Sequence, residues 1–205
     1  MPTTSPAAVR THLRPAIVLT LLLCVITGFL YPALVTGLAQ LLFPWQAHGS
    51  LVTANGRVVG SALIGQPFTK PQYFHPRPSA AGAGYDATAS AATNKGPTDR
   101  KLADTLVAGA VATAVEEDGA VRGHVPSDMA TTSASGLDPD ISPANAELQV
   151  ARVARARNVP ADSIRAILRR HTAGRQFGFF GEPRVNVLLL NLALDSLVPL
   201  SHESP

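Results

Sequence analysis

The sequence has few of the residues on which several classes of protein depend. Only one of its 205 residues is cysteine, and 15% are charged, well below the roughly 25% of an ordinary soluble domain. A single cysteine excludes a framework of intrachain disulfides and a metal site built from several thiolates. The low charge argues against a highly charged disordered tail, a coiled coil or a nucleic-acid-binding tail. The formal net charge of +3 is too small to indicate an anionic partner by itself.

Recognisable catalytic and ligand-binding motifs are also missing. The sequence contains no phosphate-binding GxxxxGK[ST] loop, no GxSxG nucleophile elbow and no HExxH metal motif, and its six histidines are scattered singly. No Phe, Tyr or Trp occurs between Asp86 and Gln176, so the arginine-rich part of the chain lacks the aromatic platform on which bases stack. We therefore predict no catalytic residues, no metal, no cofactor of its own and no nucleic-acid partner.

The missing charge is concentrated near the amino terminus. No Asp, Glu, Lys or Arg occurs from Pro15 to Gly56, and residues 16–43 are almost entirely apolar. About 20 such residues suffice to cross a bilayer, which predicts a transmembrane helix over residues 15–43. A cleaved signal peptide is the alternative, but the run is about twice the 7–15 residues of a signal h-region.

The basic residues around this stretch predict its orientation. Arg10 and Arg14 precede the span, whereas the first charge after it is Arg57. Because cytoplasmic flanks carry the excess of Lys and Arg, residues 1–14 are predicted to form a short cytoplasmic tail. Residues 44–205 are then predicted to form an extracytoplasmic domain of a single-pass protein of the plasma membrane.

The predicted span has its own pattern of small and weakly polar residues. Helices in lipid associate through such residues, because they let two backbones approach closely. The residues predicted to pack against another subunit are Thr20, Cys24, Gly28, Ala33 and Gly37. Pro32 has no N–H group, so it is expected to release the carbonyl of Gly28 and to kink the helix there.

The sequence after the span carries signals for both strands and helices. Asn55-Gly56, flanked by apolar β-branched residues, predicts a hairpin over residues 51–64. Residues 65–97 are rich in Pro, Gly, Ala, Ser and Thr, and a loop of this length indicates a functional or partner-bound segment. Helices are predicted over residues 98–118, 143–158, from 160 onward and 185–197, the last as a buried central helix.

Single residues predict where these helices begin, end and face. Ser142-Pro143 is an N-cap and first-turn pair, and Gly119 ends the 98–118 helix. One stripe of that helix is predicted to contain Leu102, Leu106, Ala110 and Thr113. The predicted fold is therefore a single N-terminal transmembrane helix followed by one mixed α/β (α+β) extracytoplasmic domain.

Charge is segregated along the predicted domain. Residues 98–142 carry eight acidic and three basic residues, whereas residues 151–175 carry seven arginines and one acid. Two interpretations stay open. The segments either form opposite patches that neutralise each other within the fold, or the arginines form a surface that faces an anion or a partner.

Several contiguous segments resemble one family in their order along the chain. They read FHPRPSAAGAGYDATAS, SGLDPDISPANAELQVARVARAR and GEPRVNVLLLNLALD, and they lie at residues 74–90, 135–157 and 181–195. These segments, and the single span, resemble the C subunit of the bacterial Kdp high-affinity potassium-transporting ATPase. The resemblance covers residues 15–197. It departs from the family's usual pattern at Ala91-Ala92-Thr93 and at Asp140.

The resemblance implies a non-catalytic accessory subunit in the bacterial plasma membrane. Its partners would be the ATP-hydrolysing subunit and the potassium-channel-like subunit of the pump. It would assemble the complex and act as a catalytic chaperone that raises the affinity of the ATP-hydrolysing subunit for ATP. ATP would be a ligand only within that complex, and the resemblance assigns the nucleotide contact to Gln149 in the LQV segment.

The predicted topology conflicts with that contact, because it places Gln149 outside the cytoplasm, where ATP is not expected. We therefore interpret Gln149 as a helix-face residue and expect any effect on ATP use to pass through the span. The candidate outer interface consists of Arg77, Ser79, Tyr85, Asp86, Arg152 and Arg155. The alternative functions are a membrane-anchored hydrolase of the cell envelope and a binding module for a small anion.

Overall fold

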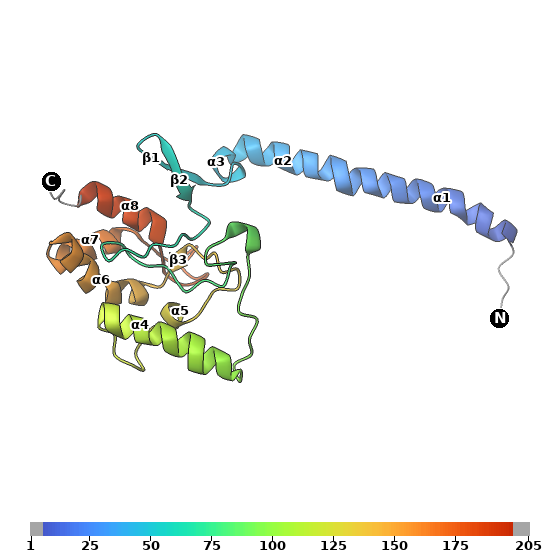
Figure 1. The fold of residues 1–205 in the computed structure, drawn as a ribbon. Helices are drawn as coiled ribbons and strands as arrows, with labels where there is room; N and C mark the ends of the chain where they lie inside the picture. Colours follow the sequence, from blue (N-terminus) through green and yellow to red (C-terminus); the bar gives the residue numbers. More distant parts are fainter. Residues whose placement is uncertain (1–5, 199–205) are drawn as a thin grey trace. The chain divides into compact units, whose positions relative to one another are not determined.

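The structure is a computed structural model that describes residues 6–198, with side chains from residue 11 onward (Figure 1). The chain divides into two compact units, one ending at Ser50 and the other beginning at Leu51. Residues 1–5 of the predicted tail and residues 199–205 of the predicted domain lie outside the described residues.

The first unit is a long apolar helix. It consists of α1 (Pro6–Val25), the π-helical turn η1 (Ile26–Leu30) and α2 (Tyr31–Leu42), followed by the short α3 (Pro44–Ala47). The helical stretch Thr11–Leu42 is long and apolar enough to cross a membrane. Its large apolar side chains are exposed on all sides within the unit, as in a helix that faces lipid. The predicted single apolar helix near the amino terminus is confirmed.

Pro32 alters the helix differently from the prediction. The wide turn η1 ends at Leu30, two residues before the proline, and the N–H of Tyr31 donates to the carbonyl of Ile26, five residues earlier. The hydroxyl of Thr27 donates to the carbonyl of Leu23 at 2.7 Å. Such π turns accommodate a helix to a residue that cannot continue the regular hydrogen-bond ladder. Gly28 therefore lies in a π turn rather than in a regular α-helix.

The second unit opens with the predicted hairpin. Strands β1 (Leu51–Ala54) and β2 (Arg57–Ser61) pair antiparallel. Asn55 and Gly56 both have positive φ, 51° and 74°, as a two-residue hairpin turn of this hand requires. The hairpin is confirmed, with its second strand ending at Ser61.

The core of this unit forms around three helices and a small sheet. Helices α6 (Pro143–Arg157), α7 (Ala161–Arg170) and α8 (Val187–Leu197) pack together (Figure 1). Strands β3 (Asp140–Ile141), β5 (Arg184–Asn186) and β4 (Thr172–Ala173) form an antiparallel sheet in that order. Fully buried apolar side chains include Phe74, Val150, Val153, Ile164, Val185, Leu190 and Leu194.

The predicted helix starts in this core follow from local capping. The Ser142 hydroxyl accepts from the N–H of Asn145 at 3.1 Å, and the Asn186 side chain accepts from the N–H of Leu189 at 3.1 Å. Asn158 adopts a left-handed conformation after α6, with φ of 54°. The start of α6 is therefore confirmed. The last helix begins at Val187 rather than Val185, because residues 184–186 form β5, and it is buried along one side.

The predicted 98–118 helix is split, and the predicted stripe is only partly its inward face, since Leu102 and Ala110 are half-buried. It comprises the π-helical segment η3 (Leu102–Val107) and α4 (Ala108–Asp118), and Gly119 ends it with φ of 68°. Leu106 and Thr113 are exposed, whereas Ala114 is buried. A π turn spaces inward residues five apart, so the inward face shifts by one residue relative to a regular helix.

The long predicted loop is irregular but firmly packed. Over residues 65–97 the only helical element is η2 (Ala87–Ala89), and α5 (Ser127–Ala130) lies in the later loop. Phe74 and Ala81 of the long loop are fully buried. These two residues of the loop are therefore part of the folded core, and the loop is packed in the chain without a partner.

Candidate functional site

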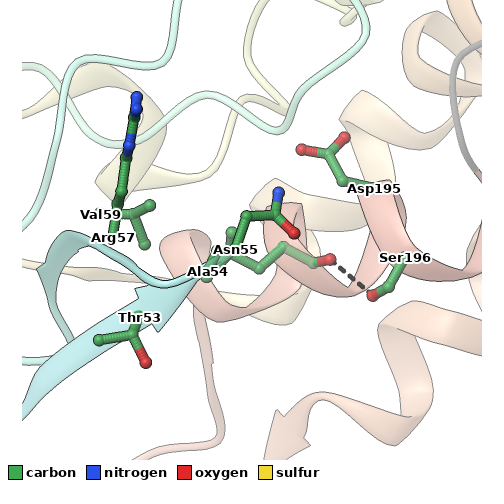
Figure 2. A pocket seen from close by; sticks show the side chains of 8 residues that line it. Thr53, Ala54, Asn55, Arg57, Val59, Asp195 and Ser196 are labelled. Carbon is green, nitrogen blue, oxygen red and sulfur yellow. Dashed lines mark hydrogen bonds between the residues drawn. The ribbon is translucent and has the colours of Figure 1, made fainter.

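A polar cavity of about 820 Å³ lies between the β1–β2 hairpin and α8. Figure 2 shows Thr53, Asn55 and Arg57 on the hairpin, and Asp195 and Ser196 on α8. The Ser196 hydroxyl donates to the carbonyl of Leu192 at 2.8 Å, a bond within its own helix. The carboxylate of Asp195 accepts from Arg157 and Tyr73. A nucleophile needs a free base within hydrogen-bond reach, and this cavity provides none among its lining residues.

Two buried amides hold the long loop between α6 and α8. The Asn191 side chain accepts from the N–H of Phe74 at 2.8 Å and donates to its carbonyl at 3.0 Å. The Gln149 side chain accepts from the N–H of His75 at 2.6 Å and donates to its carbonyl at 3.0 Å. In an extended chain, consecutive residues present their backbone groups to opposite sides. The two amides therefore replace the neighbouring strands that this segment lacks, and they satisfy buried backbone groups.

The polar atoms of Gln149 are fully engaged inside the fold. Its side chain is almost completely buried. Besides the two bonds to His75, its amide nitrogen donates to Asn145 at 2.8 Å, and its oxygen accepts from Arg152 at 2.7 Å. A nucleotide would reach this amide only if the His75 backbone left it.

Two of the predicted interface residues, Arg77 and Ser79, join two loops of the second unit, and Tyr85 and Asp86 bond within the first of these loops. Arg77 pairs with Asp138 at 2.8 Å, and the Ser79 hydroxyl donates to the carbonyl of Gly136 at 2.6 Å. The Tyr85 hydroxyl donates to the carbonyl of Arg77, and burial raises the pKa of Tyr85. Asp86 is exposed at the surface of this segment.

A glycine is required where these two loops meet. Gly136 has φ of 69°, and a Cβ there would approach the Ala91 carbonyl oxygen to 2.6 Å and the Ala81 nitrogen to 2.7 Å. Asp86 caps the short helix η2, because its carboxylate accepts from the backbone N–H and the hydroxyl of Thr88. The structure thus gathers Arg77, Ser79, Tyr85 and Asp86 on one loop surface, whereas Arg152 and Arg155 lie on α6.

The arginines are largely neutralised inside the fold, and Arg152 does not lie on the surface as predicted. Arg152 is 7% exposed and donates to Asp118 at 2.8 Å, to Gln149 and to two backbone carbonyls. Three others of the group, Arg157, Arg165 and Arg175, also pair with acids. Burial of a guanidinium requires such partners. Of the two predicted arginines, Arg155 alone is exposed, and it stays a candidate for a surface contact.

His75 belongs to a cluster of charged side chains between α4 and the long loop. Its Nδ1 is 3.4 Å from the carboxylate of Glu117, and its Nε2 is 3.1 Å from the carbonyl of Lys70. Burial, and then the nearby Arg152 guanidinium, lower the pKa of His75 below its usual 6.5. Burial raises the pKa of the neighbouring Asp118.

We expect the second unit to lose stability as the pH falls below about 6.5. The folded state binds a proton at His75 less readily than the unfolded chain does, so stability is lost between pH 6.5 and the lowered folded pKa. Asp118 acts in the opposite direction, because burial raises its pKa above the usual 3.8 and the folded state then binds its proton more readily than the unfolded chain does. Thermal unfolding of the full chain in detergent at pH 7.5 and 5.5 measures the effect. The loss of stability between these two pH values should be smaller in His75→Asn. An unchanged pH dependence in that variant would contradict the assignment of the loss to His75.

The five predicted packing residues of the span are all exposed within the first unit. Thr20 and Cys24 lie on α1, Gly28 in η1, and Ala33 and Gly37 on α2. A Cβ added at either glycine would meet no atom within 4 Å. The helix therefore has open space at its two glycines, and their contact with another subunit stays a prediction.

Comparison with known proteins gives the family. Residues 13–196 match the family model described as KdpC, K⁺-transporting ATPase, c chain. The match covers nearly all of the described chain, including the span, the loop held by the amides and α8. The chain belongs to the KdpC family.

Similar KdpC proteins cover almost the same length. The potassium-transporting ATPase KdpC subunit of Gemmatimonas aurantiaca is 64% identical over 187 residues, which are 91% of this chain and 93% of the relative. The KdpC subunit of Koribacter versatilis is 52% identical over 191 residues, covering 93% and 97%. That of Caulobacter vibrioides is 54% identical over 189 residues, covering 92% and 94%. The resemblance found in the sequence is thereby confirmed.

Sequence reasoning missed several residues that organise this KdpC fold. Asn191, Asn145 and Asp118 were not singled out, because a lone amide or carboxylate in a helix carries no pattern of its own. Phe177 and its neighbours form an exposed aromatic loop that is visible in the sequence as FGFF.

Proposed function

We propose that this chain is the accessory subunit of a K⁺-transporting ATPase and has no catalytic role of its own. It would stabilise the assembly of the ATP-hydrolysing and channel-like subunits in the plasma membrane. The observation that carries the proposal is the KdpC family match over residues 13–196. The candidate membrane helix Thr11–Leu42 supports a membrane location.

The proposal places the second unit outside the cytoplasm. Arg10 and Arg14 flank the start of the helix, whereas no charge follows it before Arg57, which supports a cytoplasmic amino terminus. In this arrangement the chain raises the ATP affinity of the motor subunit without touching ATP. The engaged amide of Gln149 supports an indirect effect.

The two alternative functions have no specific support among the described residues. A hydrolase requires an activated nucleophile, and the Ser196 hydroxyl is bonded within its own helix. An anion-binding module would be expected to use the arginine-rich segment, but Arg152 and Arg165 of that segment pair with acids. The accessory role is therefore the function that the geometry supports best.

Affinity purification from cells that express the complete ATPase tests this role. We expect the tagged chain to retain both larger subunits, and membranes without the chain to need a higher ATP concentration for half-maximal ATPase activity. A chain that purifies alone, or an ATP dependence that its deletion leaves unchanged, would contradict the accessory role.

The topology is tested by labelling in intact cells. Cys24 is the only cysteine, so Cys24→Ser combined with Ala112→Cys creates a single thiol on the exposed side of α4. An impermeant maleimide should label it before the cells are broken. Protection of this thiol in intact cells, with labelling only after lysis, would place the second unit in the cytoplasm.

A further inference from the structure

Three exposed phenylalanines lie on one short connection of the second unit. Residues 174–183 join β4 to β5, and Phe177, Phe179 and Phe180 within them are 87%, 64% and 58% exposed. The other two phenylalanines of this unit, Phe68 and Phe74, pack in or against the core. Exposed apolar clusters of this kind mark interaction sites.

The connection is a closed loop with a defined shape. Gln176 and Phe180 exchange two backbone hydrogen bonds, at 2.8 and 2.9 Å. Arg175 and Glu182 form an ion pair of 2.6 Å across its base. We call residues 175–182 the aromatic loop. Its internal bonding shows that the exposed rings do not belong to a disordered linker.

The rings themselves are positioned in advance. Phe179 and Phe180 contact each other, with centroids 4.2 Å apart. Phe177 has φ of 52°, a left-handed conformation that a bulky residue rarely adopts. Backbone strain of this kind concentrates at binding sites, and preorganised rings lose little conformational entropy on binding.

An acidic groove begins at the base of the aromatic loop. It has a volume of about 350 Å³ and is lined by four carboxylates. Three of them pair with arginines, as Asp138 with Arg77, Asp140 with Arg184 and Glu182 with Arg175, so the excess of negative charge comes from the fourth, Asp128. These charged residues are Asp128, Asp138, Asp140, Glu182, Arg77 and Arg184. Burial, and then the charge of Asp138, raise the pKa of Asp140, as expected where carboxylates crowd together.

The charge of this surface selects a protein partner over a lipid surface. The groove keeps only a small excess of negative charge after its ion pairs are counted, and this charge disfavours anionic headgroups. Arg175, the arginine of the aromatic loop, is paired with Glu182 and offers no free positive charge to a lipid surface. Membrane-interface anchors are typically Trp and Tyr together with free basic residues, and residues 174–183 contain neither aromatic type. Rigid aromatic anchors beside a polar rim are characteristic of protein–protein hot spots.

We infer that the aromatic loop is a docking element that inserts its phenylalanines into an apolar pocket of another subunit of the ATPase. Basic residues beside that pocket would face the acidic groove. The inference rests on the proposed function, since it requires that the chain assembles with the larger subunits.

Photo-cross-linking identifies what the loop touches. Phe177 is replaced by p-benzoylphenylalanine in cells that express the complete ATPase, and the membranes are irradiated. We expect an adduct that contains this chain and a larger ATPase subunit. Adducts with lipid alone, or with a second copy of this chain, would overturn the inference. The same probe at Val121, which is 66% exposed, is the control, and an equal yield there would also overturn it.

Loss of the rings measures their contribution. The double variant Phe177→Ser, Phe179→Ser should weaken retention of the larger subunits by about 30-fold or more, as hot-spot truncations do. Its thermal midpoint should not change, because both side chains are exposed. The Phe177→Leu, Phe179→Leu variant should recover part of the retention. Unchanged retention in the serine variant would overturn this inference and leave the proposed function standing. Failure of the unsubstituted chain to retain any subunit would overturn the proposed function.

Discussion

Replacing Arg157 with methionine is expected to lower the free energy of unfolding by about 3–5 kcal/mol. The Arg157 side chain is fully buried and pairs with Asp195 at 2.7 Å. It also donates to the carbonyls of Gln72 and Val198, at 2.8 and 2.7 Å. Methionine fills similar space but leaves these acceptors without their donor. Chemical denaturation of the full chain in detergent measures the loss.

A neighbouring arginine provides the control for this experiment. Arg155 lies on the same helix but is exposed, so Arg155→Met should stay within about 0.5 kcal/mol of the parent. Adding Asp195→Leu to Arg157→Met should restore part of the loss, because it removes the carboxylate left unpaired. If Arg157→Met and Arg155→Met lowered the free energy of unfolding equally, the buried contacts of Arg157 would not be the source of the predicted stability.

Replacing Gln149 with leucine is expected to lower the free energy of unfolding by about 2–4 kcal/mol, because each buried polar group left unpaired costs about 1–3 kcal/mol. The substitution leaves the N–H and carbonyl of His75 without their partners. It also removes an acceptor of Arg152. The exposed Arg155 on the same helix provides the control, since Arg155→Gln should change stability little.

The same variant separates a structural role of Gln149 from a nucleotide contact. If Gln149 holds the long loop, Gln149→Leu lowers the amount of assembled ATPase but leaves the ATP concentration for half-maximal activity unchanged per assembled complex. A steep rise in that concentration, with normal stability of the chain, would instead assign the nucleotide contact to Gln149. ATPase assays on purified complexes at matched subunit content distinguish the two results.

Local elements of this fold could be predicted because their causes are local. Asn55-Gly56 determines a two-residue turn, Ser142-Pro143 caps a helix, and the charge-free run before Gly56 forms an apolar helix. Each depends on the conformational preference of a few adjacent residues. The π turns at Ile26–Leu30 and Leu102–Val107 were not predicted, because a regular helical period assumes that no residue is inserted.

The candidate site could be predicted only in part. Arg77, Ser79, Tyr85 and Asp86 are close in sequence, and the structure keeps them on one loop surface. Arg152 belongs to the same arginine-rich segment as Arg155, yet one is buried and the other exposed. A count of charges along the chain cannot distinguish them, because burial depends on where the acidic partner lies after folding.

The sequence by itself determined the family, the apolar helix, the hairpin and the main helices of the second unit. These depend on composition, local propensity and contiguous motifs, which need no knowledge of distant contacts. Only the tertiary structure decided that Gln149 and Asn191 hold consecutive residues of the long loop, and that Asp118 and Asp195 neutralise buried arginines. The reason is physical, since a buried amide or guanidinium is defined by partners between 34 and 117 residues away in the chain.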